Sequence, residues 1–129
     1  METAVKYVKL YRVQHSISGV GPYHESNVHD DISMEFDRAH NDLDSHPTPY
    51  AESEGGVFMY GDRHSAFGSL AQYKQWFNSQ ERNIMANNGF QLLELEVPEH
   101  DVVKILPKQA VFKRTMETKI VKVLPCHEV

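Results

Sequence analysis

The stretch that decides the fold runs from Ala66 to Phe90 and reads A-F-G-S-L-A-Q-Y-K-Q-W-F-N-S-Q-E-R-N-I-M-A-N-N-G-F. Ser69 stands where a helix N-cap is expected. Gln72 follows at the spacing of a capping box, in which each side chain accepts a hydrogen bond from a free backbone N–H. Asn87-Asn88-Gly89 closes the stretch with a glycine suited to the left-handed conformation that follows many helices. This pattern predicts one helix that begins at the Ser69 cap and ends at Asn87-Asn88-Gly89.

The predicted helix is amphipathic. Its apolar residues fall near one face at helical spacing and are Leu70, Tyr73, Trp76, Phe77, Ile84 and Met85. The residues that fall mostly on the other face are Lys74, Gln75, Asn78, Glu81 and Arg82. A helix of this kind buries its apolar face against another layer. We therefore expect the rest of the chain to form a sheet packed on this helix.

The remaining sequence reads mainly as strands, since runs of β-branched and aromatic residues end at glycine or proline. The expected strands are Val5–Val13, Val57–Tyr60, Phe90–Val97, Asp101–Leu106, Gln109–Arg114 and Thr118–Leu124. A second helix is expected over Asp30–Leu43, and a long loop over residues 44–56. Short connections imply antiparallel neighbours. The sequence thus predicts one α+β domain over residues 1–129, with a mostly antiparallel sheet of about six strands on one main helix.

Length and composition narrow the classes of protein. No apolar run in the 129 residues approaches the roughly 20 needed to cross a bilayer, so we expect no membrane segment. The first residues have no signal-peptide layout. The one cysteine, Cys126, excludes an internal disulfide and lies in a tail that we expect to fray. These features favour a cytoplasmic protein.

Charge is unevenly distributed along the chain, whose net charge is −5. The segment from Glu25 to Glu54 holds nine acidic residues and one base, Arg38, which leaves +3 for everything else. An acidic lobe argues against nucleic acid as a ligand, because contacts with phosphates supply most of such binding. The segment would fit a basic surface on a partner protein, although a solvated acidic loop explains the same composition.

Few residues form a recognisable chemical motif. None of the eight histidines belongs to an H-E-x-x-H pattern, and a lone cysteine cannot build a cysteine-based zinc site, so no metal is expected. What remains is Arg12 on the first strand, His64 and Ser65 with Ser69 before the main helix, and Gln109 opening a later strand. An arginine among apolar residues is costly to bury unless it meets an anion, whereas at a strand end it can reach solvent.

The order of these segments carries a resemblance. L-Y-R-V on a first strand, F-G-S-L-x-Q opening a helix, G-F-x-L-x-x-x-x-V and a strand beginning Q-A-V-F are similar to a group of small bacteriophage proteins. The order of elements also resembles the ADP-ribosyltransferase fold. In the arginine-type branch of that superfamily, an arginine on the first strand holds the phosphates of NAD. A serine on the next strand contacts the nicotinamide ribose, and a glutamate near a later strand activates the bond that is broken.

Carried onto this sequence, the resemblance implies that Arg12 holds the phosphates and that Ser65 or Ser69 takes the place of the serine. Gln109 stands where the glutamate would be. A glutamine cannot take up a proton, so the resemblance implies binding of NAD more strongly than transfer. Its amide could still form a hydrogen bond with a ribose hydroxyl.

Two functions therefore compete, and a third possibility is a structural subunit that associates with copies of itself through a sheet edge. The first is a nucleotide-binding protein with Arg12 as a phosphate clamp and Tyr23 as a stacking surface. Its site would consist of Arg12, His15, Gly21, Tyr23, His64, Ser69 and Gln109. The second is a non-enzymatic protein whose acidic segment, residues 25–54, binds a basic surface of a host protein, such as one of a bacterial defence system.

Overall fold

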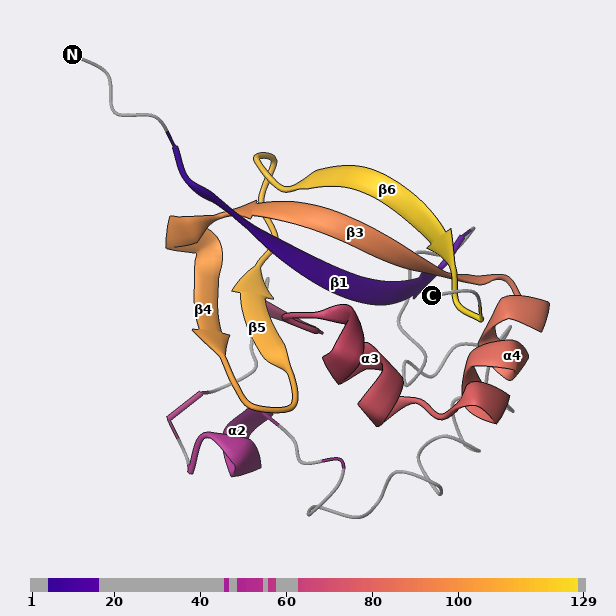
Figure 1. Cartoon of the computed structure of the whole chain (residues 1–129). Coiled ribbons are helices and arrows are strands. Elements are labelled where there is room, and N and C mark those ends of the chain that lie inside the picture. Colours follow the sequence, from indigo (N-terminus) through magenta and orange to yellow (C-terminus); the bar gives the residue numbers. More distant parts are fainter. Residues whose placement is uncertain (1–4, 17–45, 47–48, 55, 58–62, 128–129) are drawn as a thin grey trace.

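The computed structural model describes residues 5–16, 46, 49–54, 56–57 and 63–127, and Figure 1 shows their arrangement. Two three-stranded antiparallel sheets form the molecule, one with the strand order β1-β3-β6 and the other with the order β2-β5-β4. The strands are β1 (Tyr7–His15), β2 (Arg63–Ala66), β3 (Phe90–Pro98), β4 (Val102–Ile105), β5 (Ala110–Lys113) and β6 (Lys119–Pro125). The helices are α2 (Pro49–Glu52), α3 (Leu70–Trp76), α4 (Ser79–Asn87) and the single 3-10 turn η1 (Glu99–Asp101).

The α+β class and the antiparallel pairing are confirmed, but the expectation of one sheet is wrong. After Pro98 the chain turns through η1, so β4 leaves the first sheet and pairs with β5 instead. In the described part of the chain, backbone hydrogen bonds connect the two sheets at one bridge, where Tyr11 and Phe67 exchange bonds of 2.8 and 2.7 Å. A chain redirected by a proline and a tight turn cannot continue the ladder of the strand before it.

Five of the six expected strands occur, with ends that differ by at most two residues. The expected strand at Val57–Tyr60 is not confirmed, because Val57 lies outside any strand and residues 58–60 lie outside the described part of the chain. The strand before α3 is instead β2, in a segment interpreted only as a lead into the helix. The expected helix at Asp30–Leu43 also falls outside the described residues.

The main helix is two helices, so the expectation of one continuous helix is wrong. Phe77 ends α3 in an extended conformation, with φ −113° and ψ 120°. Asn78 then begins α4 with a capping box. Its side chain accepts from the Glu81 N–H at 2.8 Å, and the Glu81 carboxylate accepts from the Asn78 N–H at 2.9 Å. A second cap of this quality stabilises a new helix start, which explains the break.

The cap that begins α3 is confirmed in part. The Ser69 hydroxyl accepts a hydrogen bond from the Gln72 N–H at 3.1 Å. The Gln72 side chain does not close the box on Ser69. It accepts from the Gly68 N–H and donates to the carbonyl oxygens of Leu106 and Pro107 at 2.8 and 2.9 Å. Gln72 therefore ties α3 to the turn between β4 and β5.

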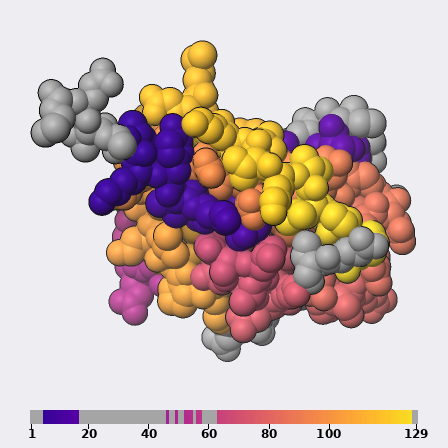
Figure 2. All heavy atoms as spheres, turned by 45° about the horizontal axis from the view of Figure 1, so that its top comes forward, coloured from indigo at the N-terminus to yellow at the C-terminus, as the bar shows by residue number. Residues whose placement is uncertain are grey.

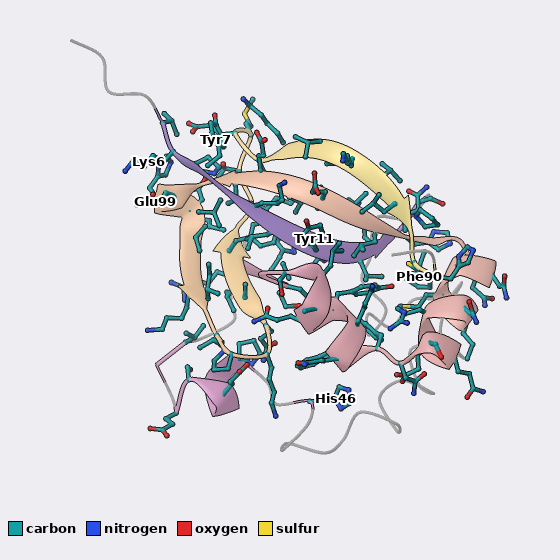
Figure 3. All side chains as sticks on the ribbon, in the orientation of Figure 1. Lys6, Tyr7, Tyr11, His46, Phe90 and Glu99 are labelled. Atoms are coloured by element: carbon teal, nitrogen blue, oxygen red, sulfur yellow. The ribbon has the colours of Figure 1, made fainter. Side chains whose placement is uncertain are left out.

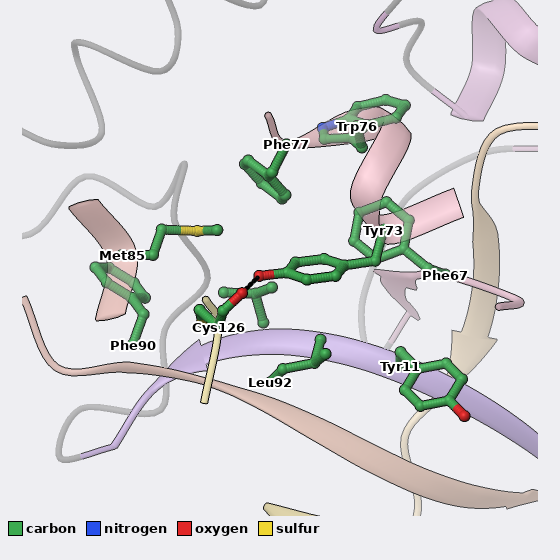
Figure 4. Packing of buried hydrophobic residues seen from close by; sticks show 10 residues of the cluster. Tyr11, Phe67, Tyr73, Trp76, Phe77, Met85, Phe90, Leu92 and Cys126 are labelled. Atoms are coloured by element: carbon green, nitrogen blue, oxygen red, sulfur yellow. Dashed lines mark hydrogen bonds between the residues drawn. The ribbon is translucent and has the colours of Figure 1, made fainter. Parts of the chain in front are cut away.

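The central strand of the first sheet, β3, is covered on both faces, which explains why apolar residues occur on both sides of this strand. One face packs on the helices, with a core that Figure 4 shows and that contains Tyr11, Val13, Phe67, Tyr73, Trp76, Phe77, Met85, Phe90, Leu92 and Cys126. The other face packs on the second sheet through Leu10, Ala66, Leu93, Leu95, Val97, Ala110 and Phe112. The second set is called the inter-sheet core below.

The residues after β6 contradict the expected frayed tail. Cys126 is fully buried, and its carbonyl oxygen accepts a 2.8 Å hydrogen bond from the Tyr73 hydroxyl. Leu124 and Pro125 end β6, and Leu124 packs against the helical core. Cys126 follows them and packs in this core as a small apolar residue. In the described part of the chain, every helix is too short to cross a membrane.

Candidate anion-binding site between the two sheets

Arg12 lies on β1, two residues beyond Leu10, and therefore on the strand face that meets the second sheet. Its Nη1 donates a 2.7 Å hydrogen bond to the carbonyl oxygen of Ser65 on β2. Its Nε is enclosed, and has no hydrogen-bond partner among the residues that the structure describes. The guanidinium is thus fixed between the sheets and retains an unused donor.

Arg114 follows β5 directly and reaches the same place. Its Nη1 donates a 3.2 Å hydrogen bond to Oε1 of Gln14, which stands two residues after Arg12 on the same face of β1. Burial, and secondly the positive charge of Arg114, lower the pKa of Arg12 to about 10. Arg12 therefore remains charged at neutral pH, with a second guanidinium close to it.

Neither arginine of this Arg12–Arg114 pair meets a carboxylate in the part of the chain that the structure describes. Within that part, the two side chains bond to the Ser65 carbonyl oxygen and to the Gln14 side chain, and their charges repel each other. Two guanidinium groups with free N–H donors suit an oxygen-rich anion such as a phosphate or a carboxylate. The pair has the chemistry of an anion-binding site.

The position of the pair follows from the strand patterns. On β1 the inter-sheet core ends at Leu10, and the next inward residue is Arg12. On β5 the core ends at Phe112, and the next inward residue is Arg114. His64 on β2 pairs in register with Phe112, and their rings lie 5.9 Å apart between centroids. His64 therefore lies on the same face of the second sheet as Phe112.

The other residues expected in the site lie elsewhere. The Ser69 hydroxyl caps α3. Gln109 stands at the opposite end of β5 from Arg114, and its Nε2 donates a 3.0 Å hydrogen bond to Oε1 of Glu52 on α2. His15 is buried at the helical core, edge-on to Phe90. Gly21 and Tyr23, also expected to contribute, fall outside the described residues.

His46, which belongs to the acidic segment (residues 25–54), contacts the end of α3. His46 places Nε2 2.7 Å from the Trp76 carbonyl oxygen, and its ring lies edge-on to the indole at 4.9 Å between centroids. Figure 3 shows His46 beneath the end of α3. Further along the segment, Glu52 accepts from the Lys108 N–H at 2.7 Å as well as from Gln109. These contacts attach the end of the segment to the folded core.

Comparison with known proteins gives a family for the chain. The model of the family described as bacteriophage T4 Y00F protein matches residues 5–126. The chain belongs to this family. The curated proteins and the solved structures gave no match. The expectation of a small bacteriophage protein is confirmed, whereas the ADP-ribosyltransferase-like order of elements stays a prediction.

The matched region of this Y00F-family chain includes both arginines of the pair, and sequence reasoning found only one of them. Arg114 repeats the pattern of Arg12, because each follows alternating apolar residues that face the inter-sheet core. That repetition was the available signal. The repeated pattern indicates a shared site only when β1 and β5 are known to pack on each other. The sequence alone does not show that packing. Among the described residues, no three histidine, cysteine or acidic side chains gather as a metal site would require.

Proposed function

We propose that this bacteriophage protein binds a phosphate-bearing ligand at the Arg12–Arg114 pair, with NAD and ADP-ribose as the first candidates. The observation that carries the proposal is the closeness of two guanidinium groups, with no carboxylate beside them in the described part of the chain. Charged groups removed from water are usually paired. A phosphate would supply the missing negative charge.

Each side chain has a defined part in this proposal. Arg12 would hold the ligand through the N–H groups that its bond to Ser65 leaves free. Arg114, positioned by Gln14, would contact a second oxygen or a second phosphate. His64 would border the ligand on the β2 side. Such charge-assisted hydrogen bonds are short and strong compared with neutral ones.

The proposal concerns binding and does not extend to transfer. Gln109, which the resemblance would place in the catalytic position, carries no charge and is engaged by Glu52 at the other end of β5. A transferase needs a base or a carboxylate at the reacting bond. Phosphate recognition alone requires only the arginines.

Calorimetry with the purified full chain tests the proposal, with NAD, ADP-ribose and inorganic pyrophosphate as ligands. Arg12→Lys keeps the charge but removes the planar fork, and Arg114→Gln removes the second charge. We expect each variant to weaken binding at least about tenfold. Lys104→Gln is the matched control, because Lys104 is exposed on β4, and it should leave the affinity unchanged. Absence of binding to all three ligands, or binding that both arginine variants leave intact, would overturn the proposal.

A second candidate function rests on charge. The segment from Glu25 to Glu54 carries a net charge of −8, which would suit a basic surface of a host protein. Reversing the charges of Asp30, Asp31, Asp42 and Asp44 should abolish capture of such a partner and leave anion binding intact. Arg12→Lys should do the opposite. We infer the host cytoplasm as the compartment, supported by the single, free cysteine.

A further inference from the structure

β6 forms an edge of the first sheet. It pairs with β3 along one side, and in the described part of the chain no strand pairs with the other side. Figure 1 places β6 at the top of the molecule, and Figure 2 shows its atoms at the surface over most of its length. An unpaired strand edge presents a row of backbone N–H and C=O groups that can pair with another chain.

Several side chains of β6 are apolar and exposed. Ile120, Val121 and Val123 are 50%, 40% and 55% exposed. All three are β-branched, a type that favours strand pairing. The register with β3 shifts once, between Glu94 and Leu95, and is otherwise regular. Proline, which would block pairing, stands only at the end of the strand, at Pro125.

The charges of β6 are all positive. Between Thr118 and Cys126 the sequence has two lysines, Lys119 and Lys122, and no acidic residue. Lys119 lies over the ring of Tyr7, with Nζ 4.5 Å from the ring centroid. Lys122 forms no ion pair with any residue that the structure describes.

Glu94, the in-register neighbour of Lys122 on β3, is already engaged. Its Oε1 accepts a 3.1 Å hydrogen bond from the Tyr11 hydroxyl and lies 3.9 Å from Nζ of Lys9. Among the described residues, Lys122 therefore has no ion-pair partner in the sheet. The edge presents exposed β-branched residues and lysines within one short strand.

We propose that the outer edge of β6 binds an extended segment of a partner protein in which apolar and acidic residues alternate. Main-chain hydrogen bonds would add the segment to the sheet, its apolar residues would meet Ile120 and Val123, and its acidic residues would meet Lys119 and Lys122. A second copy of this chain fits less well, because its own β6 carries only lysines as charged residues and would bring no acidic side chain to Lys119 and Lys122. This inference does not depend on the Arg12–Arg114 pair.

The test uses a capped six-residue peptide of alternating valine and glutamate, titrated into the isotope-labelled full chain and followed by NMR. We expect the amide signals of Lys119–Pro125 to shift, together with those of β3 behind them. Replacing every glutamate of the peptide by lysine should abolish the shifts. Methylation of alternate peptide nitrogens, which removes donors along one edge, should also abolish them.

Protein variants complete the test. Lys122→Gln should lower the affinity for the peptide about two- to fivefold, as expected for the loss of one exposed ion pair. Lys74→Gln, at an exposed position on α3, is the matched control and should have no effect. Shifts outside the first sheet, equal binding of the lysine peptide, or a peptide-free dimer joined through β6 in sedimentation and NMR experiments would each overturn the inference.

Discussion

The Tyr73 hydroxyl donates a 2.8 Å hydrogen bond to the carbonyl oxygen of Cys126. Both residues are fully buried, and Figure 4 shows the bond at the centre of the helical core. It joins α3 to the chain just after β6, across 53 positions of sequence. A buried carbonyl of this kind has no route to water, so its one described partner determines how well the end of the chain is held.

Removing that partner should destabilise the fold. In Tyr73→Phe the ring stays packed while the Cys126 carbonyl loses its donor, which should lower the free energy of unfolding by about 1–3 kcal/mol. Urea denaturation followed by Trp76 fluorescence measures the change. Tyr7→Phe is the matched control, because Tyr7 is partly exposed and its ring contact with Lys119 survives. Equal stability of Tyr73→Phe and Tyr7→Phe would contradict the prediction.

The Cys126 thiol should be unreactive in the folded protein. Burial raises its pKa to about 11, although the hydrogen bond from Tyr73 acts in the opposite direction. Because the thiolate is the reactive form, a disulfide reagent at pH 8 should label the native thiol far more slowly than the unfolded one. Labelling at the same rate in buffer and in denaturant would show that the thiol is accessible.

The same shift makes stability depend on alkaline pH. The unfolded thiol loses its proton near pH 9, whereas the folded thiol keeps it until near pH 11. Between these values the folded state binds more protons, so the free energy of unfolding should fall as the pH rises. Burial also raises the pKa of Tyr73, which adds to the fall at the upper end of this range. In Cys126→Ala the free energy of unfolding should fall less steeply with pH over this range, whatever the stability of the variant at neutral pH.

The capping box of α4 should be measurable as a stability difference. Asn78→Ala removes the acceptor for the Glu81 N–H and should cost about 1 kcal/mol. Asn83→Ala, at an exposed position inside the same helix, should be neutral or slightly stabilising, because alanine favours helix. Thermal and urea unfolding of the two variants, compared side by side, decides the matter. A loss that is equal in both would mean that Asn78 contributes only as a helical residue.

Gly89 should tolerate no side chain. Its φ is +85°, and an added Cβ would lie 2.6 Å from Nε2 of His15. Gly89→Ala should therefore cost about 1–3 kcal/mol, from backbone strain and displacement of the histidine. Gly68→Ala is the matched control, since its Cβ would meet only side-chain atoms at wider distances, Ile105 at 3.3 Å and Oε1 of Gln72 at 3.4 Å. The prediction fails if both substitutions change the unfolding midpoint by the same small amount.

Local signals in the sequence predicted individual elements well. The Ser69 cap, the glycine after α4 and five strands were found because each depends on a few neighbouring residues. The break at Phe77 was missed although its signal was local too. Asn78 and Glu81 have the spacing of a capping box, but both were interpreted only as residues on the polar face of one helix.

Features that depend on contacts between residues far apart in the sequence were harder to predict. The split into two sheets depends on the turn after Pro98, and no pattern within β4 or β5 states which strand each will join. The candidate site was only partly predicted for the same reason. Arg12 was found from its own strand, whereas its closeness to Arg114 follows from how two strands of different sheets pack. Glu52, which holds Gln109 from a distant helix, had no sequence signal that we can identify.

The pairing of β1 with β3 has a consequence for synthesis on the ribosome. Tyr11 and Glu94 face each other in the sheet but are separated by 83 positions, and among the described residues the other backbone partner of β1 is Phe67. At typical translation speeds, β1 waits about 4–16 seconds before β3 is made. During that interval an apolar strand has its longest partner still missing. The nascent chain is therefore most vulnerable to aggregation or to chaperone binding at its beginning, and slow codons before Phe90 would lengthen that exposure.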